Sequence, residues 1–255
     1  MDNSKEHLLK ALAKNVRYDG RKLTEYRDIK VKYNISGSAE GSASVKIGET
    51  EVLVGVKLAI EEPYPDTQDR GNLMVNAELR PISSSKFEPG PPGDQAIELA
   101  RVVDRGIREA KAIDVKKLCI KEGEKVWSVM IDVCSLNDAG NLFDAAALGA
   151  LAALKNARFP KETGGIIDYG EKTDKPLPIN TEPIAITVLK IGDKLLVDPL
   201  PDEEGLIDAR LTVAITQKNE ICALQKGGEV PLSIDDFNAM IALALEKAPE
   251  LRKKL

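Results

Sequence analysis

Hydrophobic and polar positions alternate most regularly in the segment Gly37–Ile60. Apolar residues occupy every second position on both sides of the pair Gly48-Glu49. Alternation with a period of two around a short turn predicts a β-hairpin with one buried face. Similar runs predict four more strands in this part of the chain, at Ile29–Ile35, Leu73–Leu79, Lys116–Lys121 and Lys125–Leu136.

Apolar residues at helical spacing predict four helices, at Ser4–Asn15, Ile97–Arg108, Phe143–Asn156 and Ile234–Lys247. In the second helix we expect Asp94 to be the N-cap and one stripe to be buried, formed by Ile97, Ala100, Val103 and Ile107. The third helix is rich in alanine and apolar almost all round, so we expect it to lie buried between layers. Ser233 and Asp236 form a capping-box pattern ahead of the fourth.

The second part of the chain repeats the order of the first. Two hairpins ahead of the terminal helix are predicted from the strands Ile184–Ile191, Lys194–Val197, Leu206–Thr216 and Glu220–Gln225. Strands grouped ahead of helices indicate an α+β fold rather than a doubly wound parallel sheet. The charged, proline-containing segment Asp168–Pro178 is typical of a linker. We therefore expect an N-terminal helix at 1–16, a first half at 17–160, a linker at 161–182 and a second half at 183–250.

Composition and charge limit the classes of partner. The chain has 255 residues, with 36 basic and 41 acidic side chains and a net charge of −5. No overall positive field attracts nucleic acid, so any RNA contact must use a local patch or a surface shared with a partner chain. Aromatic residues make up only 4% of the chain, which argues against modules that stack bases on several exposed rings.

The three cysteines, Cys119, Cys134 and Cys222, lie in apolar, strand-like runs without a CxxC pair. We interpret them as buried free thiols in a reducing cytoplasm. The single histidine, His7, argues against a zinc site, and we expect no bound metal. No N-terminal signal segment is visible, and no apolar run approaches the roughly 18 residues of a membrane span, so we expect a cytoplasmic protein without membrane contact.

Three arginines, Arg101, Arg105 and Arg108, are spaced i, i+4 and i+7 along the second helix and share one face. Guanidinium groups are always charged and offer planar donor forks, so this stripe suits the recognition of phosphate groups. An ion-paired solvent face explains the pattern equally well, because the stripe is flanked at salt-bridging spacings by Glu98, Asp104 and Glu109. Both interpretations stay open on these residues alone.

Several enzyme classes are excluded because the chain has no Gly-rich nucleotide loop and no GxSxG motif. Two features remain. The turn Asn137–Asn141 opens the alanine-rich helix, and a helix N-terminus can bind phosphate, but Asp144 would repel an anion, so we favour a structural turn. The segment Asp198–Glu204 clusters carboxylates that can hold a divalent metal or act as general acids, although an exposed acidic loop is the commoner explanation.

Four of these features, taken in order, resemble the RNase PH family of phosphorolytic exoribonucleases. They are Asp19-Gly20-Arg21, the hairpin Gly37–Val56, the helix IELARVVDRGIR, and the acidic segment with Asp198, Glu203 and Glu204. The resemblance runs from about residue 17 to residue 247. It implies an RNase PH-like fold of two related sheet-and-helix halves, of the ribosomal protein S5 domain 2-like type, in agreement with the repeated order of elements.

The chain departs from active members of this family at both reactive positions. Active members carry a Gly-Gly-Thr-Arg-type or Gly-x-Arg-x-Ser-type turn that binds the attacking phosphate, but here Phe143 and Asp144 occupy the arginine position and its neighbour. They also carry Asp-x-Asp, whose second Asp serves as the general acid, and here that position is Leu200. A basic pair that precedes the arginine helix in active exosome subunits corresponds to about Gly93-Asp94. The resemblance therefore implies a chain without catalytic residues.

The resemblance extends to a non-catalytic, RNA-binding ring subunit of the archaeal exosome. It implies that the chain pairs with an active RNase PH-type subunit, completes its 3′-to-5′ phosphorolytic exoribonuclease site and contributes to a hexameric ring of three heterodimers. Cap subunits with S1 and KH or zinc-ribbon domains would sit on one face, and single-stranded RNA would be the ligand. No cofactor is implied.

The same resemblance implies which residues contact RNA. Arg101 and Arg105 are expected to reach across the dimer interface to RNA bound at the catalytic partner. Arg108 lies nearer the acidic flank of the helix and is a weaker candidate. Lys86 and Arg80, beside the proline-rich loop Ser83–Gly93, are further candidates for RNA contact.

Two alternatives remain. The chain can be a stand-alone phosphate-dependent exoribonuclease that uses Asp198 or Asp202 as its acid. It can also be a purely structural ring component that never touches RNA.

Overall fold

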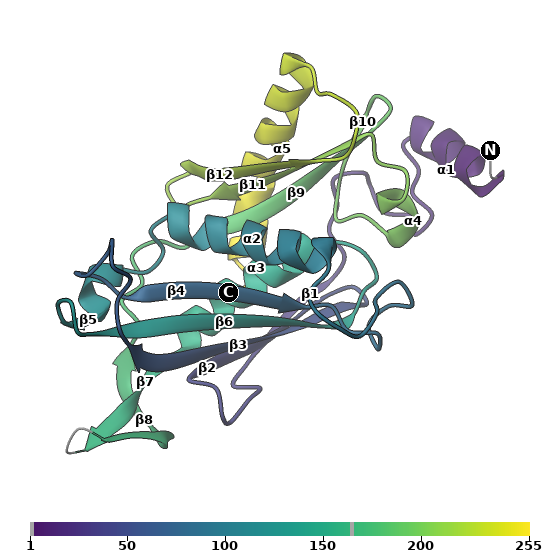
Figure 1. Cartoon of the computed structure of the whole chain (residues 1–255). Helices are drawn as coiled ribbons and strands as arrows, with labels where there is room; N and C mark the ends of the chain where they lie inside the picture. The colour runs from purple at the N-terminus through teal and green to yellow at the C-terminus, as the bar shows by residue number, and fades with distance from the viewer. Residues whose placement is uncertain (1–2, 164–165) are drawn as a thin grey trace.

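Figure 1 shows the computed structural model, which describes residues 3–163 and 166–255 and has helices lying between two sheets. The first sheet has the strand order β1-β2-β3-β6-β4, with β5 paired to β6. All neighbours are antiparallel except β4 and β6, which run parallel. Its strands are β1 (Ile29–Tyr33), β2 (Gly41–Ile47), β3 (Thr50–Glu61), β4 (Asn72–Glu78), β5 (Cys119–Lys121) and β6 (Lys125–Asn137). The predicted hairpin about Gly48-Glu49 is confirmed, with β2 and β3 as its arms.

The second sheet is antiparallel throughout, in the order β10-β9-β11-β12. Its strands are β9 (Ile184–Ile191), β10 (Lys194–Val197), β11 (Ala209–Ile215) and β12 (Ile221–Gly227). Both predicted hairpins of this half are confirmed, and β9 and β10 have the predicted bounds. The α+β class is therefore also confirmed.

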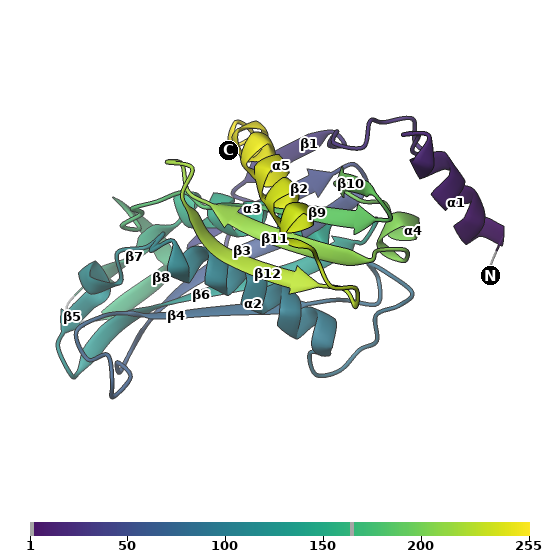
Figure 2. The ribbon, with the colours of Figure 1, turned by 90° about the horizontal axis from the view of Figure 1, so that it is seen from above.

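The helices are α1 (Asn3–Ala13), α2 (Asp94–Glu109), α3 (Leu142–Asn156), the one-turn α4 (Pro201–Glu204) and α5 (Ile234–Arg252), with a 3-10 turn η1 (Val115–Leu118). In Figure 1, α2 and α3 lie between the two sheets, and Figure 2 shows α5 crossing β9 and β11. The N-cap of α5 is Ser233, which forms the predicted capping box with Asp236.

The alanine-rich helix α3 is buried along most of its length, as predicted. Its small side chains let it pack against β2 and β3 on one side and β9 on the other. Gly149 lies at the closest approach, where a Cβ would overlap the side chain of Val54. One continuous apolar core therefore spans both halves of the chain.

The buried face of α2 is shifted by about one residue from the predicted stripe. Ile97 was expected to be buried but is 47% exposed, whereas Leu99 and Val102 are buried. The helix begins at Asp94 and its N-cap is Gly93, so the prediction of Asp94 as the N-cap is wrong. The buried face is wide because α2 packs against β4 and α3 and also contacts β11 and β12.

Two further expectations are corrected. The predicted linker at 161–182 contains regular structure, because β7 (Arg158–Thr163) and β8 (Ile166–Pro176) form a separate antiparallel pair. The cysteines are free thiols, but Cys119, Cys134 and Cys222 are half-buried rather than buried. Cys119 and Cys222 lie on the edge strands β5 and β12, and Cys134 lies on β6, next to the edge strand β4.

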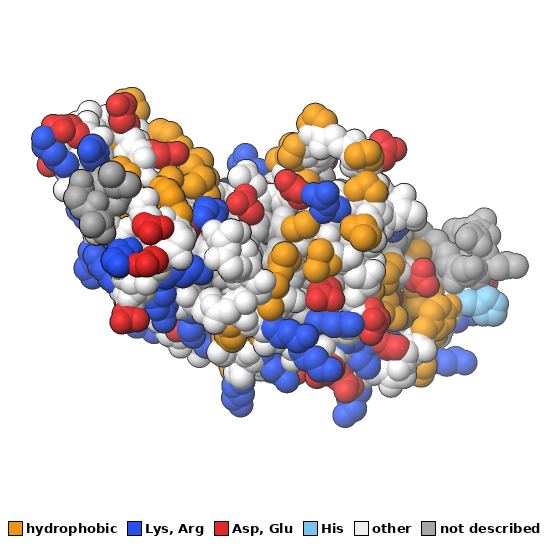
Figure 3. All heavy atoms as spheres, turned by 90° about the horizontal axis from the view of Figure 1, so that it is seen from below, with side chains coloured by type: hydrophobic (Ala, Val, Ile, Leu, Met, Phe, Trp, Pro, Cys, Tyr) orange, Lys and Arg blue, Asp and Glu red, His pale blue; other side chains and the backbone are white. Residues whose placement is uncertain are grey.

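The surface carries charges of both signs. Figure 3 shows the molecule from below, with acidic and basic side chains interspersed among apolar ones and no field of a single sign. Across the described ranges, no helix combines the length and apolar character needed to cross a membrane.

Candidate functional site

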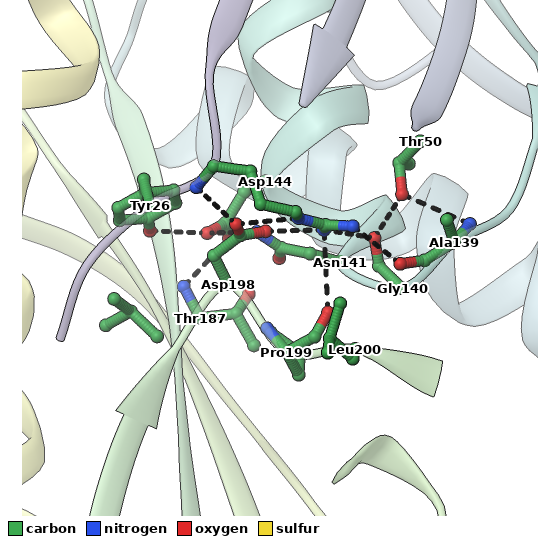
Figure 4. A network of polar contacts seen from close by, with 12 residues as sticks. Tyr26, Thr50, Ala139, Gly140, Asn141, Asp144, Thr187, Asp198, Pro199 and Leu200 are labelled. Atoms are coloured by element: carbon green, nitrogen blue, oxygen red, sulfur yellow. Dashed lines mark hydrogen bonds and ion pairs between the residues drawn. The ribbon is translucent and has the colours of Figure 1, made fainter. Parts of the chain in front are cut away.

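Asp198 lies at the centre of a buried cluster that joins the N-terminal segment to both halves of the chain (Figure 4). It follows β10 in a left-handed conformation, with φ of 48°. Its Oδ2 accepts a hydrogen bond from Arg21 Nη1 at 2.8 Å, and bonds of the same length from the backbone N–H and Nε of Arg27. Its Oδ1 accepts from Arg27 Nη2 at 2.6 Å and from Asn141 Nδ2 at 3.0 Å. Both oxygens of this carboxylate therefore accept hydrogen bonds from donors of the same chain.

Arg27 also links the two loops that meet beside Asp198. Its guanidinium donates to the carbonyl oxygens of Ala139 at 2.7 Å and Gly140 at 3.0 Å, immediately before α3. Gly140 has φ of 86°, and a Cβ there would overlap the carbonyl oxygen of Pro199. Only glycine tolerates this approach without strain. The N-terminal segment therefore fixes the turn that precedes α3.

The acidic segment 198–204 is not the exposed loop that we expected from the sequence. Glu203, on α4, is 1% exposed and pairs with the equally buried Arg17, whose Nε lies 2.9 Å from its Oε1. Asp202 is exposed, on the same short helix. Carboxylates are rarely buried unless they are paired. The buried arginines therefore explain why the sequence expectation was wrong for Asp198 and Glu203.

Asp144, in the first turn of α3, is fully buried. Its Oδ2 accepts from the Tyr26 hydroxyl at 2.6 Å, and its Oδ1 accepts from the backbone N–H of Thr187 on β9 at 2.8 Å. Burial raises the pKa of this carboxyl to about 7, although both hydrogen bonds lower it. Asp144 thus links α3 to β9 and to the N-terminal segment.

A cavity of about 370 Å³ opens beside the N-terminus of α3, and Phe143 and Glu204 are among the residues that line it. Glu204 Oε1 accepts a hydrogen bond from the backbone N–H of Asn141 at 2.8 Å. Burial raises the pKa of Glu204 to about 7. A helix N-terminus is where an anion would bind, and here a carboxylate of the same chain takes one of its N–H groups.

Phe143 is covered by a cation. The guanidinium carbon of Arg210, on β11, lies 4.1 Å from the centroid of the ring, a cation–π contact. Arg210 also pairs with Glu98 of α2, with 2.5 Å between Nη2 and Oε1. Arg210 is thus held over the ring by an acid of α2.

Arg101 and Arg105 are exposed on α2 and have different surroundings from Arg108. Neither of the first two makes a hydrogen bond or ion pair with any residue that the structure describes. They line a groove of about 400 Å³ between α2 and β4, together with Val75 and Ile97. These two arginines are therefore available to an external anion.

Arg108 is engaged within the chain. Its guanidinium forms a two-pronged pair with Asp104, at 2.6 and 3.0 Å, and also donates to the carbonyl of Leu73 at 2.9 Å. The hydrogen bond with Asp104 raises the pKa of Arg108. The ion-pair interpretation of the stripe thus fits Arg108, whereas it does not fit Arg101 or Arg105.

The other two cations proposed from the sequence lie near the proline-rich loop. Lys86 is exposed and lines the cavity that contains Phe143. Arg80 is exposed and paired with Glu78 at 2.8 Å. Lys86 therefore lines the cavity at the start of α3, whereas Arg80 is engaged in a surface ion pair.

Sequence reasoning missed the residues that organise this site, namely Arg17, Tyr26, Arg27 and Arg210. Three of them lie in the irregular stretch between the first helix and the first strand, where no periodic pattern draws attention to them. Two arginines and a tyrosine in a short segment next to Asp-Gly-Arg were the available signal. Within residues 3–163 and 166–255, no three His, Cys, Asp or Glu side chains come together as metal ligands.

Comparison with known families and proteins gives consistent matches. The model of the 3′ exoribonuclease family, domain 1, matches residues 25–160, and that of domain 2 matches residues 181–247. The chain is 50% identical over 248 residues to a protein of Methanosarcina acetivorans named exosome complex component Rrp42, with 97% of this chain and 91% of that protein covered. A protein of the same name from Archaeoglobus fulgidus is 46% identical over 254 residues, with 100% and 96% covered.

Solved structures give the same result. A chain of the Archaeoglobus fulgidus exosome with RNA bound to the active site superposes with a TM-score of 0.93 and 45% identity, over 99% of this chain and 98% of that one. A chain of an archaeal exosome core gives a TM-score of 0.88 and 42% identity, over 99% and 96%. With both family models matched over most of its length, the chain belongs to the RNase PH family of 3′ exoribonucleases.

Proposed function

We propose that this chain is a non-catalytic, RNA-binding subunit of an archaeal exosome ring. In this role it pairs with a catalytic RNase PH-type subunit and helps to form that subunit's 3′-to-5′ phosphorolytic site. The observation that carries the proposal is a contrast between two places. At the start of α3, Phe143 is stacked on Arg210 and Glu204 takes a helix N–H, whereas Arg101 and Arg105 have no partner among the described residues.

Two contacts and one residue identity support the absence of a phosphorolytic site in the chain itself. Phe143 stands at the expected arginine position and is stacked against Arg210. Glu204 accepts the N–H of Asn141 at the start of α3. Leu200, at the expected general-acid position, has no proton to donate. Attack by inorganic phosphate needs an anion site and an acid for the leaving oxygen, and these positions supply neither.

The arginines support a role in positioning RNA. Arg101 and Arg105 are one helical turn apart on the exposed side of α2, and their guanidinium groups match phosphate oxygens in geometry and charge. They are expected to hold the backbone of a single strand that enters the partner's site. Lys86 is a further candidate for RNA contact, and Arg108 is assigned to the ion pair with Asp104.

The rest of the assembly is proposed on the family resemblance. Three heterodimers with the catalytic subunit would form a six-membered ring, capped by subunits with S1 and KH or zinc-ribbon domains, in the cytoplasm. The units of the chain would be an N-terminal helix at 1–16 and RNase PH-like halves at 17–160 and 183–250. The segment 161–182 between the halves carries most of the β7–β8 pair.

The proposal is tested by mixing. The chain alone, the catalytic RNase PH-type subunit alone and the two together are assayed for phosphate-dependent release of nucleoside diphosphates from single-stranded RNA. We expect no release by the chain alone and strong release on mixing. Release by this chain alone would contradict the assignment as non-catalytic.

One observation favours the alternative of a stand-alone phosphorolytic enzyme. Glu204 lines the cavity at the start of α3, and its pKa of about 7 suits a general acid. Asp198 and Asp202, considered from the sequence, do not line this cavity. If the isolated chain degrades RNA and Glu204→Gln abolishes that activity while Asp202→Asn does not, the alternative is correct.

A further inference from the structure

A further cavity lies at the C-terminal end of α2. The cavity has a volume of about 500 Å³ and lies between the loop 62–71 and the 3-10 turn η1. Its lining includes Tyr64, Arg70, Asn72, Lys111 and Lys116. It is separate from the groove of Arg101 and Arg105 and from the cavity that contains Phe143.

Tyr64 is the exposed aromatic ring of this cavity. Its side chain is 51% exposed and therefore contributes little to the core. The loop that carries it is nevertheless well fixed, because the N–H of Gly71 donates to Val115 at 2.8 Å and the N–H of Gly123 donates to Gln68 at 3.1 Å. Prolines on both sides of Tyr64 restrict the backbone further. A rigid loop thus presents an aromatic face to solvent, as stacking platforms for single-stranded nucleic acids do.

Asn72, also in the lining, links β4 to the loop that carries Tyr64. The residue is 4% exposed, and its Nδ2 donates to the carbonyl of Glu62 at 3.2 Å and to Ser128 Oγ at 3.0 Å. The bond to Glu62 thus holds the start of the loop that carries Tyr64 against the first sheet.

The charge of the lining suits a phosphate. Four cations line the cavity, namely Arg70, Arg108, Lys111 and Lys116, and Asp114 is the only acid among the lining residues. Asp114 is itself paired with Lys117 at 3.1 Å. Asp69, outside the lining, is shared by Arg70 and Lys116. Lys111 is exposed and makes no ion pair with a described residue, so it is the cation most available to a phosphate.

The acids around the cavity limit where a phosphate can lie. Asp69 and, more weakly, Asp66 act on Arg70, while Asp104 and, more weakly, Glu109 act on Arg108, so both arginines are partly compensated. A phosphate is therefore expected beside Lys111. The base would then extend toward Tyr64.

We propose that this cavity binds one nucleotide of a single-stranded RNA, with the base stacked on Tyr64 and the phosphate held by Lys111. This inference rests on the proposed function, because it extends the RNA path along α2. From Arg101 to the end of α2 the axis rises by about 12 Å, a distance that a strand of a few nucleotides spans. The arginine groove and the Tyr64 cavity would thus bind the same strand at two points.

The test uses the assembled complex with the catalytic subunit and a fluorescent single-stranded oligonucleotide. We expect Tyr64→Ala to weaken RNA binding roughly 5- to 100-fold, the range that loss of one base stack gives. Tyr64→Phe keeps the ring and is expected to bind within twofold of the wild type. Tyr169→Ala, which removes another exposed tyrosine on β8, serves as the matched control and should have no effect.

A second measurement does not depend on any variant. RNA that carries 5-iodouridine is irradiated with the wild-type complex, and cross-linked peptides are mapped; we expect a cross-link at Tyr64. Unchanged affinity of Tyr64→Ala together with no cross-link there would overturn the inference. If Arg101→Ala with Arg105→Ala still weakens binding in that case, the proposed function stands without this site. If Tyr64→Ala instead prevents ring assembly, judged by the mass in solution, the cavity is a protein contact and the inference is also wrong.

Discussion

Arg17 and Glu203 form a fully buried ion pair across 186 positions of the sequence. Arg17 lies just after α1, and Glu203 lies on α4 beside the second sheet. The guanidinium also donates to the carbonyls of Val197 at 3.1 Å and Asp198 at 2.7 Å, so each of its nitrogens has an acceptor. The pair fastens the N-terminal segment to the loop that follows β10.

We predict that Arg17→Met is strongly destabilising. It leaves the carboxylate of Glu203 buried without its cation, which typically costs about 3–5 kcal/mol. Urea unfolding measures the free energy of unfolding. The matched control is Glu6→Gln, which breaks the exposed pair with Lys10 and should change that free energy by less than about 1 kcal/mol. Equal effects of the two variants would show that the buried pair has no special role.

Tyr26→Phe is predicted to destabilise the start of α3. The variant removes the hydroxyl that donates to Asp144 and leaves a buried acceptor short of one donor, which costs about 1–3 kcal/mol. Because that hydrogen bond lowers the pKa of Asp144, its loss should also raise this pKa further above its present value of about 7. Both effects are measured by unfolding at several pH values. Tyr18→Phe, at a site 55% exposed, is the control and should match the wild type.

The pH dependence of the free energy of unfolding should reflect the titration of Glu204. Its pKa is about 7 in the folded chain against an ordinary value of 4.5, so the folded chain binds more protons between these values. The contribution of Glu204 to the free energy of unfolding is then complete below about pH 4.5, decreases as the pH rises toward 7 and levels off above it. The shift corresponds to at most about 3 kcal/mol. We expect Glu204→Gln to lose less stability over this window than the wild type, whereas the exposed Glu229→Gln should follow the wild type. Parallel curves for all three proteins would contradict the assignment.

Strand and helix positions followed from local patterns wherever one face is buried. The alternation around Gly48 and the alanine content of α3 both led to the correct elements. The β7–β8 pair was missed because the described residues of β8 are mostly exposed and β7 buries two consecutive residues, Phe159 and Pro160, so neither strand shows alternation. Ile97 was placed wrongly because α2 contacts elements on several sides, and a single stripe does not describe such a helix.

The candidate site followed from the sequence only in part. Arg101 and Arg105 stood out because helical spacing is a local property. The cluster around Asp198 did not, since its partners Arg21 and Arg27 are more than 170 positions away. Long-range pairing decided that Asp198 and Glu203 are buried and that Glu204, rather than Asp198 or Asp202, lines the cavity. No local pattern carries that information.

The most direct test of the central claim is the salt dependence of RNA binding by the assembled ring. If Arg101 and Arg105 each neutralise one phosphate of a single strand, the slope of log affinity against log salt should be shallower by about 1.4 in the variant Arg101→Ala with Arg105→Ala. A control ring with Lys30→Ala, an exposed cation of β1 whose partner is Asp28, should keep the wild-type slope. An unchanged slope and affinity in the double variant would contradict the account and leave the chain a structural component of the ring.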